Sequence, residues 1–190
     1  MIVVGILLMA CYTLMLVWVA TGFLKLSVFS SERTQPKTTF SIVIPFRNEA
    51  KNLPLLLTSL KQLNYPAHLF EIIFVDDESE DSSPEIIKDE ISRVARNDNQ
   101  LQIQLFKNKR TSASPKKDAI TEAINKAQHD WVVTTDADCQ VPSTWLQTFD
   151  TFIQQNSADF IAAPVALETG NGLLQNFQLF DQCSLQSLTM

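Results

Sequence analysis

The chain has 190 residues, of which 45% are hydrophobic and 19% are charged, and its formal net charge is −6. This length is sufficient for one domain with a real hydrophobic core. The acidic balance argues against nucleic acid as a partner, because binding to a phosphate backbone requires a basic surface.

The first predicted element is a helix that spans a membrane. From Ile2 to Leu24 the sequence has no charged residue, and a helix of that length crosses the roughly 30 Å hydrocarbon core of a bilayer. No Lys or Arg precedes the run, as it would in a cleaved signal peptide, so we interpret residues 1–25 as an uncleaved anchor. Lys25, Arg33 and Lys37 follow it, and the positive-inside rule then predicts a single-pass protein of the cell membrane whose main domain is cytoplasmic.

After a polar linker at 26–39, short apolar runs alternate with segments of helical periodicity. The predicted strands are 40–44, 71–75, 101–106, 131–135 and a fifth that opens at 160–163. Apolar spacing predicts helices within 53–63, 84–95, 119–127 and 145–153, the first with Asn52 as candidate cap and Pro54 in its first turn. This alternation indicates an α/β fold with a mostly parallel central sheet and helices on both faces.

Polar clusters follow the ends of four predicted strands. In open parallel sheets, ligands bind beyond the carboxyl ends of the strands, so these clusters predict one shared site at that edge. They are Asn48-Glu49 after the first strand, Asp76-Asp77 after the second, the basic run 107–117 after the third, and Asp136 with Asp138 after the fourth.

The acidic pair after the fourth strand is a candidate metal site. In extended backbone, residues i and i+2 point the same way, so Asp136 and Asp138 can converge on one point. Two carboxylates suit Mg²⁺ or Mn²⁺, which typically also holds substrate phosphate. The alternative is a strand followed by an ordinary acidic turn.

Each of the other clusters also has two possible roles, one in ligand binding and one in the structure alone. The run 107–117 holds five basic residues and no acid, directly before a helix N-terminus that favours anions, so it predicts a diphosphate contact or else a solvated loop. Asp77 can accept a hydrogen bond from a ribose hydroxyl or a base N–H, or can belong to an acidic turn; Glu49 can contact the nucleotide or stabilise the first helical turn.

The four glycines (5, 22, 170, 172) exclude glycine-rich phosphate loops, and the three cysteines predict neither structural zinc nor disulfides.

Together these segments resemble the GT-A glycosyltransferases of family two, which are inverting and use nucleotide-sugars. The resemblance covers about 40–166 and rests on 42–49, 72–79, Lys116 ahead of Ala119-Ile120, and 135–138. It implies a nucleotide-sugar donor and a lipid-linked or cell-envelope polysaccharide acceptor. Arg47 stands where such proteins often carry Tyr, and Glu78 where many have Gly. By this resemblance the nucleotide-sugar is bound by Pro45, Phe46, Asn48, Glu49, Asp77, Lys116 and Asp136, with Asp136 against ribose or metal and Asp138 as direct metal ligand.

The resemblance also implies a division of the chain. Residues 40–168 would form the nucleotide-sugar-binding domain, and 169–190 the start of a truncated acceptor region. Its predicted amphipathic helix runs up to Met190 without a stop signal, and the catalytic base is expected beyond that residue. The apolar face of this helix comprises Leu173, Leu174, Phe177, Phe180, Leu185 and Leu188.

Two other functions remain open from the sequence. Val75-Asp76-Asp77-Glu78 and the segment from Asp136 to Pro142 resemble the acidic pair and the acceptor loop of a phosphoacceptor receiver domain, although a receiver leaves 40–63 unexplained. A non-catalytic, membrane-tethered nucleotide-binding or scaffolding module would bind a diphosphate without requiring a metal.

Overall fold

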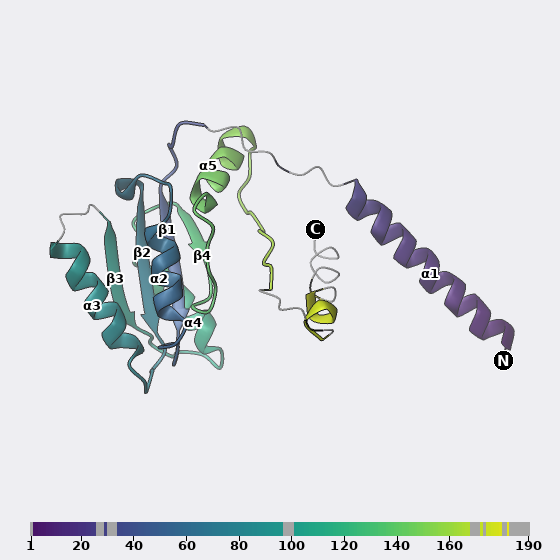
Figure 1. Cartoon of the computed structure of the whole chain (residues 1–190), viewed down its shortest axis with the longest axis horizontal. Helices are drawn as coiled ribbons and strands as arrows, with labels where there is room; N and C mark the ends of the chain where they lie inside the picture. The colour runs from purple at the N-terminus through teal and green to yellow at the C-terminus, as the bar shows by residue number, and fades with distance from the viewer. Residues whose placement is uncertain are drawn as a thin grey trace. The chain divides into compact units, whose positions relative to one another are not determined.

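The computed structural model describes residues 2–25, 29, 34–96, 101–167, 172, 174–179 and 182. Contacts between residues divide the chain into two units: Ser31–Ser157, and Met1–Ser30 together with Ala158–Met190. Figure 1 shows the α/β architecture of the first unit.

The first unit is built on one parallel sheet. Its strands are β1 (Phe40–Phe46), β2 (Phe70–Asp76), β3 (Gln102–Lys107) and β4 (Trp131–Thr134), in the order β3-β2-β1-β4. Each neighbouring pair is parallel. The chain therefore runs outward from β1 to β3 and then crosses back, so that β4 lies on the other side of β1. Ligands in such sheets bind at this reversal, here between β1 and β4.

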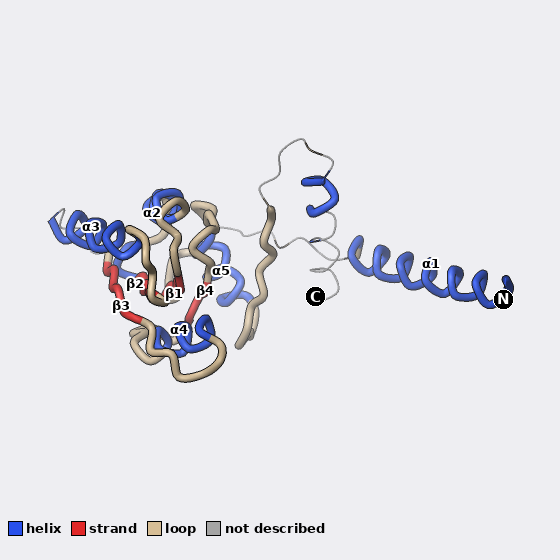
Figure 2. The backbone as a smooth tube through the Cα atoms, turned by 90° about the horizontal axis from the view of Figure 1, so that it is seen from below, coloured by secondary structure: helices blue, strands red, loops and turns tan. Residues whose placement is uncertain are grey.

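Helices cover both faces of the sheet, as predicted. Figure 2 shows α2 (Leu53–Lys61) and α3 (Ser83–Arg96) on one side and α4 (Pro115–Ile124) on the other. Side chains alternate along β1: Ile42 and Ile44 join the large cluster beneath α2 and α3, which includes Leu146 of α5 (Trp145–Gln155), whereas Val43 faces Ala119 and Ala123 of α4. The small alanines let α4 pack directly against the sheet.

The start of α2 differs in part from the prediction. Pro54 lies in the first turn, as expected, where its missing N–H has no intrahelical partner to lose. Asn52, however, makes no cap hydrogen bond with its side chain. Its Nδ2 instead donates to Glu49 Oε2 at 2.7 Å, because the nearby carboxylate offers a charged acceptor within reach.

A buried carboxylate ties the strands together at the end opposite to their carboxyl termini. Glu71 of β2 is 1% exposed. It accepts hydrogen bonds from Ser41 Oγ (2.7 Å), Gln104 Nε2 (2.9 Å) and the Gln128 N–H (2.6 Å). The donors come from β1, β3 and the segment leading into β4, so one side chain of β2 satisfies groups from three other strand regions.

The second half of the predicted linker packs on the domain. Asp150 of α5 is fully buried and accepts hydrogen bonds from the backbone N–H groups of Lys37 (3.2 Å) and Thr38 (3.0 Å), and from Thr38 Oγ1. The Tyr65 hydroxyl donates to the Thr38 carbonyl oxygen at 2.6 Å, and burial, reinforced by the charge of Asp150, raises the pKa of this phenol. The segment that leads into β1 is therefore fixed along α5.

The second unit contains α1 (Ile2–Leu24), within which Val3–Gly22 is long and apolar enough to cross a membrane, a property that anchors share with signal sequences. The fifth strand predicted at 160–163 is wrong: residues 160–167 are irregular and Phe160 is 83% exposed. A strand requires a partner for its backbone groups, and Pro164 removes a donor directly after this short apolar run. Residues 174–179 are helical, whereas Leu173, Phe180, Leu185 and Leu188 of the predicted amphipathic helix lie outside the described residues.

Candidate functional site

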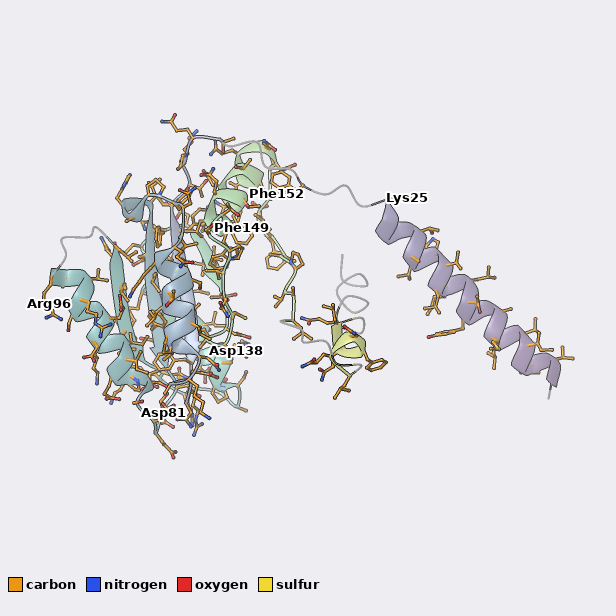
Figure 3. The ribbon with its side chains drawn as sticks, viewed as in Figure 1. Lys25, Asp81, Arg96, Asp138, Phe149 and Phe152 are labelled. Carbon is orange, nitrogen blue, oxygen red and sulfur yellow. The ribbon has the colours of Figure 1, made fainter. Side chains whose placement is uncertain are left out.

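An open cleft of about 270 Å³ lies at the carboxyl ends of β1, β2 and β4. Figure 3 shows Asp138 toward the same end of the domain as Asp81, and Phe149 and Phe152 of α5 toward the other end. All of the predicted site residues line the cleft except Asn48. The lining residues are Pro45, Phe46, Arg47, Glu49, Asp77, Lys116, Ala119, Asp136, Ala137 and Asp138.

The two acidic side chains after β4 point away from the core on either side of a buried alanine. Thr135 N–H still donates to the Val43 carbonyl oxygen at 3.2 Å, which keeps the chain beside β1 beyond the end of β4. Ala137 is 4% exposed and belongs to the large core cluster, whereas Asp136 and Asp138 are exposed. Both carboxylates line the cleft, but through a turn rather than the predicted extended backbone: β4 ends at Thr134, Ala137 and Asp138 lie in the turn, and the Cys139 N–H donates to the Asp136 carbonyl oxygen at 3.2 Å.

Asn48 serves a different contact from the predicted one. Its Oδ1 accepts a hydrogen bond from the Glu80 N–H (2.8 Å), and its own N–H donates to Ser79 Oγ (3.0 Å). Asn48 adopts a φ of 57°, in the left-handed region that Asn tolerates better than most residues. In this structure it fastens the loop after β1 to the turn after β2, so its predicted role in nucleotide binding remains a prediction.

The same loop and turn are joined at two further points. The Glu49 N–H donates to Ser83 Oγ at 2.8 Å, and the Ala50 N–H donates to Asp81 Oδ2 at 3.1 Å. Glu78 in the turn has a φ of 59°, a conformation that costs a non-glycine residue on the order of 1 kcal/mol. The loop after β1 and the turn after β2 are thus held in one conformation by backbone N–H groups that donate to side-chain oxygens.

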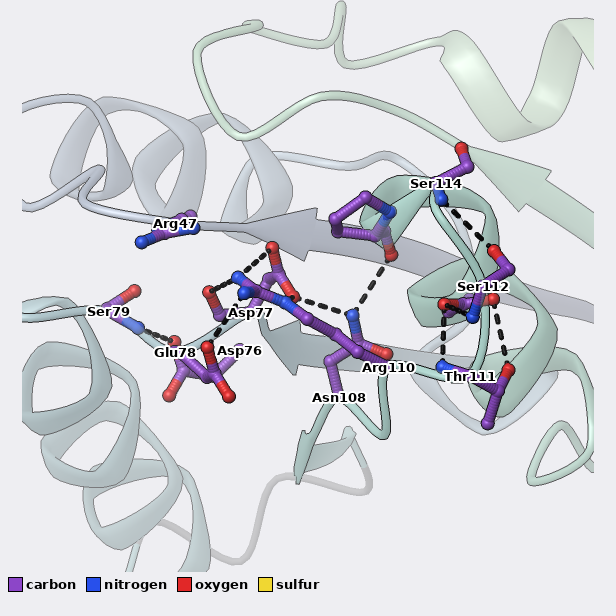
Figure 4. Close-up of polar contacts among 12 residues, drawn as sticks. Arg47, Asp76, Asp77, Glu78, Ser79, Asn108, Arg110, Thr111, Ser112 and Ser114 are labelled. Carbon is purple, nitrogen blue, oxygen red and sulfur yellow. Dashed lines mark hydrogen bonds and ion pairs between the residues drawn. The ribbon is translucent and has the colours of Figure 1, made fainter.

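Asp77 is paired with Arg110, a member of the basic run for which the sequence predicts a diphosphate contact. Arg110 Nε and Nη2 donate to Asp77 Oδ1 (2.8 Å) and Oδ2 (2.9 Å), and Asn108 Nδ2 also donates to Oδ1 (2.7 Å). Figure 4 shows Arg110 reaching both Asp77 and Glu78, whose Oε2 lies 2.8 Å from Nη1. The hydrogen bonds from Arg110 hold the pKa of the Asp77 carboxyl below its usual range, and Asn108 acts in the same direction.

This pairing predicts a pH-dependent contribution to stability. The folded-state pKa of Asp77 is lowered, so the contribution is fully present above the ordinary Asp value of about 3.9 and is lost as the pH falls through the folded-state value. Arg110→Met should therefore lower the urea denaturation midpoint by a constant amount between neutral pH and about pH 5, and by a decreasing amount in more acidic solution. Lys109→Met removes a neighbouring exposed charge and is the control; an equal effect of both variants at every pH would contradict the specific pair.

Lys116 is the member of the basic run that reaches the cleft. Its Nζ lies 2.6 Å from Asp136 Oδ1. It belongs to the first turn of α4, where Ser114 makes no cap hydrogen bond with its side chain, and free N–H groups at such a position favour anions. Asp118 accepts hydrogen bonds from the N–H groups of Thr111 (2.8 Å) and Ser112 (2.7 Å), which fixes the preceding loop and, chiefly through Ser112, lowers the pKa of the Asp118 carboxyl.

The donor set fits a divalent ion only in part. Among the described residues no group of three His, Cys, Asp or Glu side chains converges on one point. Asp136 and Asp138 supply two carboxylates, and Mg²⁺ sites commonly add substrate phosphate and water to one or two such ligands. Burial, with the charge of Asp138, raises the pKa of the neighbouring Cys139 thiol.

The topology does not support the receiver alternative. In a receiver, the strand with the acidic pair is the first strand of a sheet in the order 2-1-3-4-5. Here Asp76 ends the second strand and Asp77 follows it, and β1 separates β2 from β4, the strand that precedes Asp136. The two acidic segments therefore follow strands that are not neighbours.

Two curated relatives of the chain are sugar transferases by name. TarS, the poly(ribitol-phosphate) beta-N-acetylglucosaminyltransferase of Staphylococcus aureus, is 26% identical over 137 residues, which cover 72% of this chain and 22% of TarS. The undecaprenyl-phosphate 4-deoxy-4-formamido-L-arabinose transferase of Pseudomonas savastanoi pv. phaseolicola is 38% identical over 114 residues, 58% of this chain and 31% of that enzyme. The chain thus spans under a third of the length of these two relatives.

Solved structures show the same fold. S. aureus TarS 1-349 in complex with UDP-GlcNAc has a TM-score of 0.56 at 26% identity, covering 71% of this chain and 36% of that one. The mannosyltransferase PcManGT from Pyrobaculum calidifontis, in complex with GDP-Man and Mn²⁺, has a TM-score of 0.58 at 24% identity, covering 74% and 39%. The sequence profile of glycosyl transferase family 2 matches residues 41–180, and the chain belongs to this family.

Proposed function

We propose that the cleft is the nucleotide-sugar donor site of a membrane-anchored glycosyltransferase with a lipid-linked or cell-envelope polysaccharide acceptor. The observation that carries the proposal is the meeting of Asp77, Lys116, Asp136 and Asp138 in one cleft, at the reversal of strand order. The carboxylates and the ammonium group come from three different segments, and one nucleoside diphosphate bound with a cation can contact all of them.

Different cleft residues would contact different parts of the nucleotide-sugar donor. Pro45, Phe46, Glu49 and Asp77 would contact the nucleoside, with Asp77 kept ionised by Arg110 and so able to accept a hydrogen bond from a base N–H or a ribose hydroxyl. Lys116 and the first turn of α4 would contact the diphosphate.

Asp136 and Asp138 would hold Mg²⁺ or Mn²⁺ together with diphosphate oxygens. When bound, such an ion neutralises the charge that develops on the departing diphosphate. The protein's own part is to keep both carboxylates on one side of the chain, which the burial of Ala137 between them achieves.

The relatives and the N-terminal helix support the acceptor class and location. TarS is named for a polyol-phosphate polymer, and the second relative for a phosphorylated membrane lipid. We propose that α1 anchors the protein in the cell membrane with the cleft on the cytoplasmic side, where soluble nucleotide-sugars are available.

Calorimetry on the full chain in detergent tests the donor site. With Mn²⁺ present, one of UDP-GlcNAc and GDP-mannose should bind with a micromolar to low millimolar Kd, and the corresponding nucleoside should bind at least about tenfold more weakly because the diphosphate contacts are lost. If UDP, GDP, UDP-GlcNAc and GDP-mannose all fail to bind at millimolar concentration, the proposed donor site is wrong.

A further inference from the structure

The ammonium group of Lys116 forms an ion pair with a carboxylate oxygen of Asp136, one of the two proposed metal ligands. Its Nζ lies 2.6 Å from Asp136 Oδ1, and both residues line the cleft together with Asp138. A divalent ion held by Asp136 and Asp138 would approach the same carboxylate, so the cation and the ammonium group compete for Asp136. This competition exists before any donor is bound.

The backbone that carries Lys116 is fixed, whereas its side chain is not. Ala119 and Ala123 of α4 are fully buried against the sheet, and Asp118 bonds the loop before the helix. The Lys116 side chain itself is 62% exposed. Its four methylene groups let the ammonium group move by several ångströms while α4 stays in place.

The two arginines near the cleft have other engagements. Arg110 forms a bidentate ion pair with Asp77 and a further ion pair with Glu78. Arg47 lies 3.9 Å from Glu80, across the loop that joins the two walls. Of these three cations, Lys116 is the one whose ion pair is with a carboxylate of the acidic pair after β4.

We infer that Lys116 is a partner-switching residue: the internal counterion of Asp136 in the empty cleft, and a counterion of the diphosphate once the donor is bound. The inference rests on the proposed function and adds to it that the cation and the diphosphate bind more favourably together than separately. A cation that binds alone must break the ion pair between Lys116 and Asp136. When the cation binds together with a diphosphate, the ion pair between Lys116 and Asp136 is also broken, but the ammonium group gains phosphate oxygens that replace it.

The consequence is positive coupling between cation and diphosphate. By linkage, each ligand must raise the affinity of the other by the same factor. Both partners of the ion pair are more than half exposed, and pairs of this kind change an equilibrium by at most about fivefold. Free cation is thus held up to about fivefold more weakly than it would be without the ion pair, and a bound diphosphate removes this penalty.

Titration with Mn²⁺, followed by the EPR signal of the free ion, tests this on the full chain in detergent. Lys116→Met keeps the length of the side chain without its charge, and should bind Mn²⁺ alone about two- to fivefold more tightly than the unaltered chain. With pyrophosphate present, the same variant should lose that advantage and bind pyrophosphate more weakly. Lys88→Met, at an exposed lysine of α3 outside the cleft, should leave both affinities unchanged.

The outcomes separate the inference from the function on which it rests. If Lys116→Met binds Mn²⁺ alone no more tightly, while the unaltered chain still binds Mn²⁺ and UDP or GDP, the partner switch is wrong and the donor site stands. An equal coupling factor between Mn²⁺ and pyrophosphate in both proteins would likewise overturn the partner switch alone. If the unaltered chain binds neither Mn²⁺ nor any nucleoside diphosphate, both proposals fall.

Discussion

Asp138→Ala should abolish the Mn²⁺-dependent part of nucleotide-sugar binding. The variant leaves Asp136 as the single carboxylate of the pair, and Lys116 already lies against one of its oxygens. Changes to groups that merely orient metal ligands cost 10–100-fold in affinity, so loss of a direct ligand should cost at least about 100-fold. Calorimetric titration of nucleotide-sugar with and without Mn²⁺ measures this loss.

A matched control separates the metal role from a general loss of negative charge. Asp130 is exposed and directly precedes β4, at the end of the strand opposite to the cleft. Asp130→Ala should bind nucleotide-sugar as the unaltered chain does. Because Asp138 is exposed, its replacement should change stability by no more than about 0.5 kcal/mol. Unchanged Mn²⁺-dependent binding in Asp138→Ala would remove the pair from the metal site.

Local patterns in the sequence account for the fold class and for the positions of most cleft residues. The strands β1, β2 and β4 are mostly apolar, β3 alternates glutamines with apolar residues over its first half, and each strand ends within a few residues of a polar cluster. In a parallel sheet those ends share one edge regardless of strand order. The cleft was therefore predictable without the order β3-β2-β1-β4, which decides only that β1 and β4 flank the reversal.

The partners of individual side chains were not predictable in the same way. Arg110 lies 33 residues from Asp77, and Asp150 lies 112 residues from Thr38. Such pairings depend on loop conformation and helix placement, on which local periodicity carries no information. The charge pattern alone therefore places Arg110 among the anion-binding residues, although its guanidinium serves two acidic side chains of the protein itself.

The wrong prediction at 160–163 and the unpredicted contacts of Asn48 have a common physical origin. Composition gives the propensity of a segment, whereas a strand or a ligand contact also needs a partner in space. Residues 160–163 form no strand pairing, and the amide oxygen of Asn48 is already bonded to Glu80. The predicted domain end at 168 lies between the last residue of the compact unit, Ser157, and the end of the family match at 180, and it stays a prediction.

Glu71→Ala should lower the free energy of unfolding of the domain by about 3–5 kcal/mol. The change removes a buried acceptor and leaves Ser41 Oγ, Gln104 Nε2 and the Gln128 N–H without it. Each buried donor that is left unsatisfied costs about 1–3 kcal/mol. Urea denaturation, followed by fluorescence of Trp131 and Trp145, measures the loss, because both tryptophans pack against the core.

Glu71→Gln is the variant that distinguishes hydrogen bonding from charge. Its amide oxygen can still accept from Ser41 Oγ and the Gln128 N–H, and its amide nitrogen would then face Gln104. Rotation of the Gln104 amide by half a turn presents an oxygen to that nitrogen, so every donor regains an acceptor and the loss should stay below about 1.5 kcal/mol. Glu122→Ala, on α4, controls for the loss of one glutamate. If Glu71→Gln were as damaging as Glu71→Ala, the negative charge rather than the acceptor geometry would hold the strands together, because only the charge is absent from both variants.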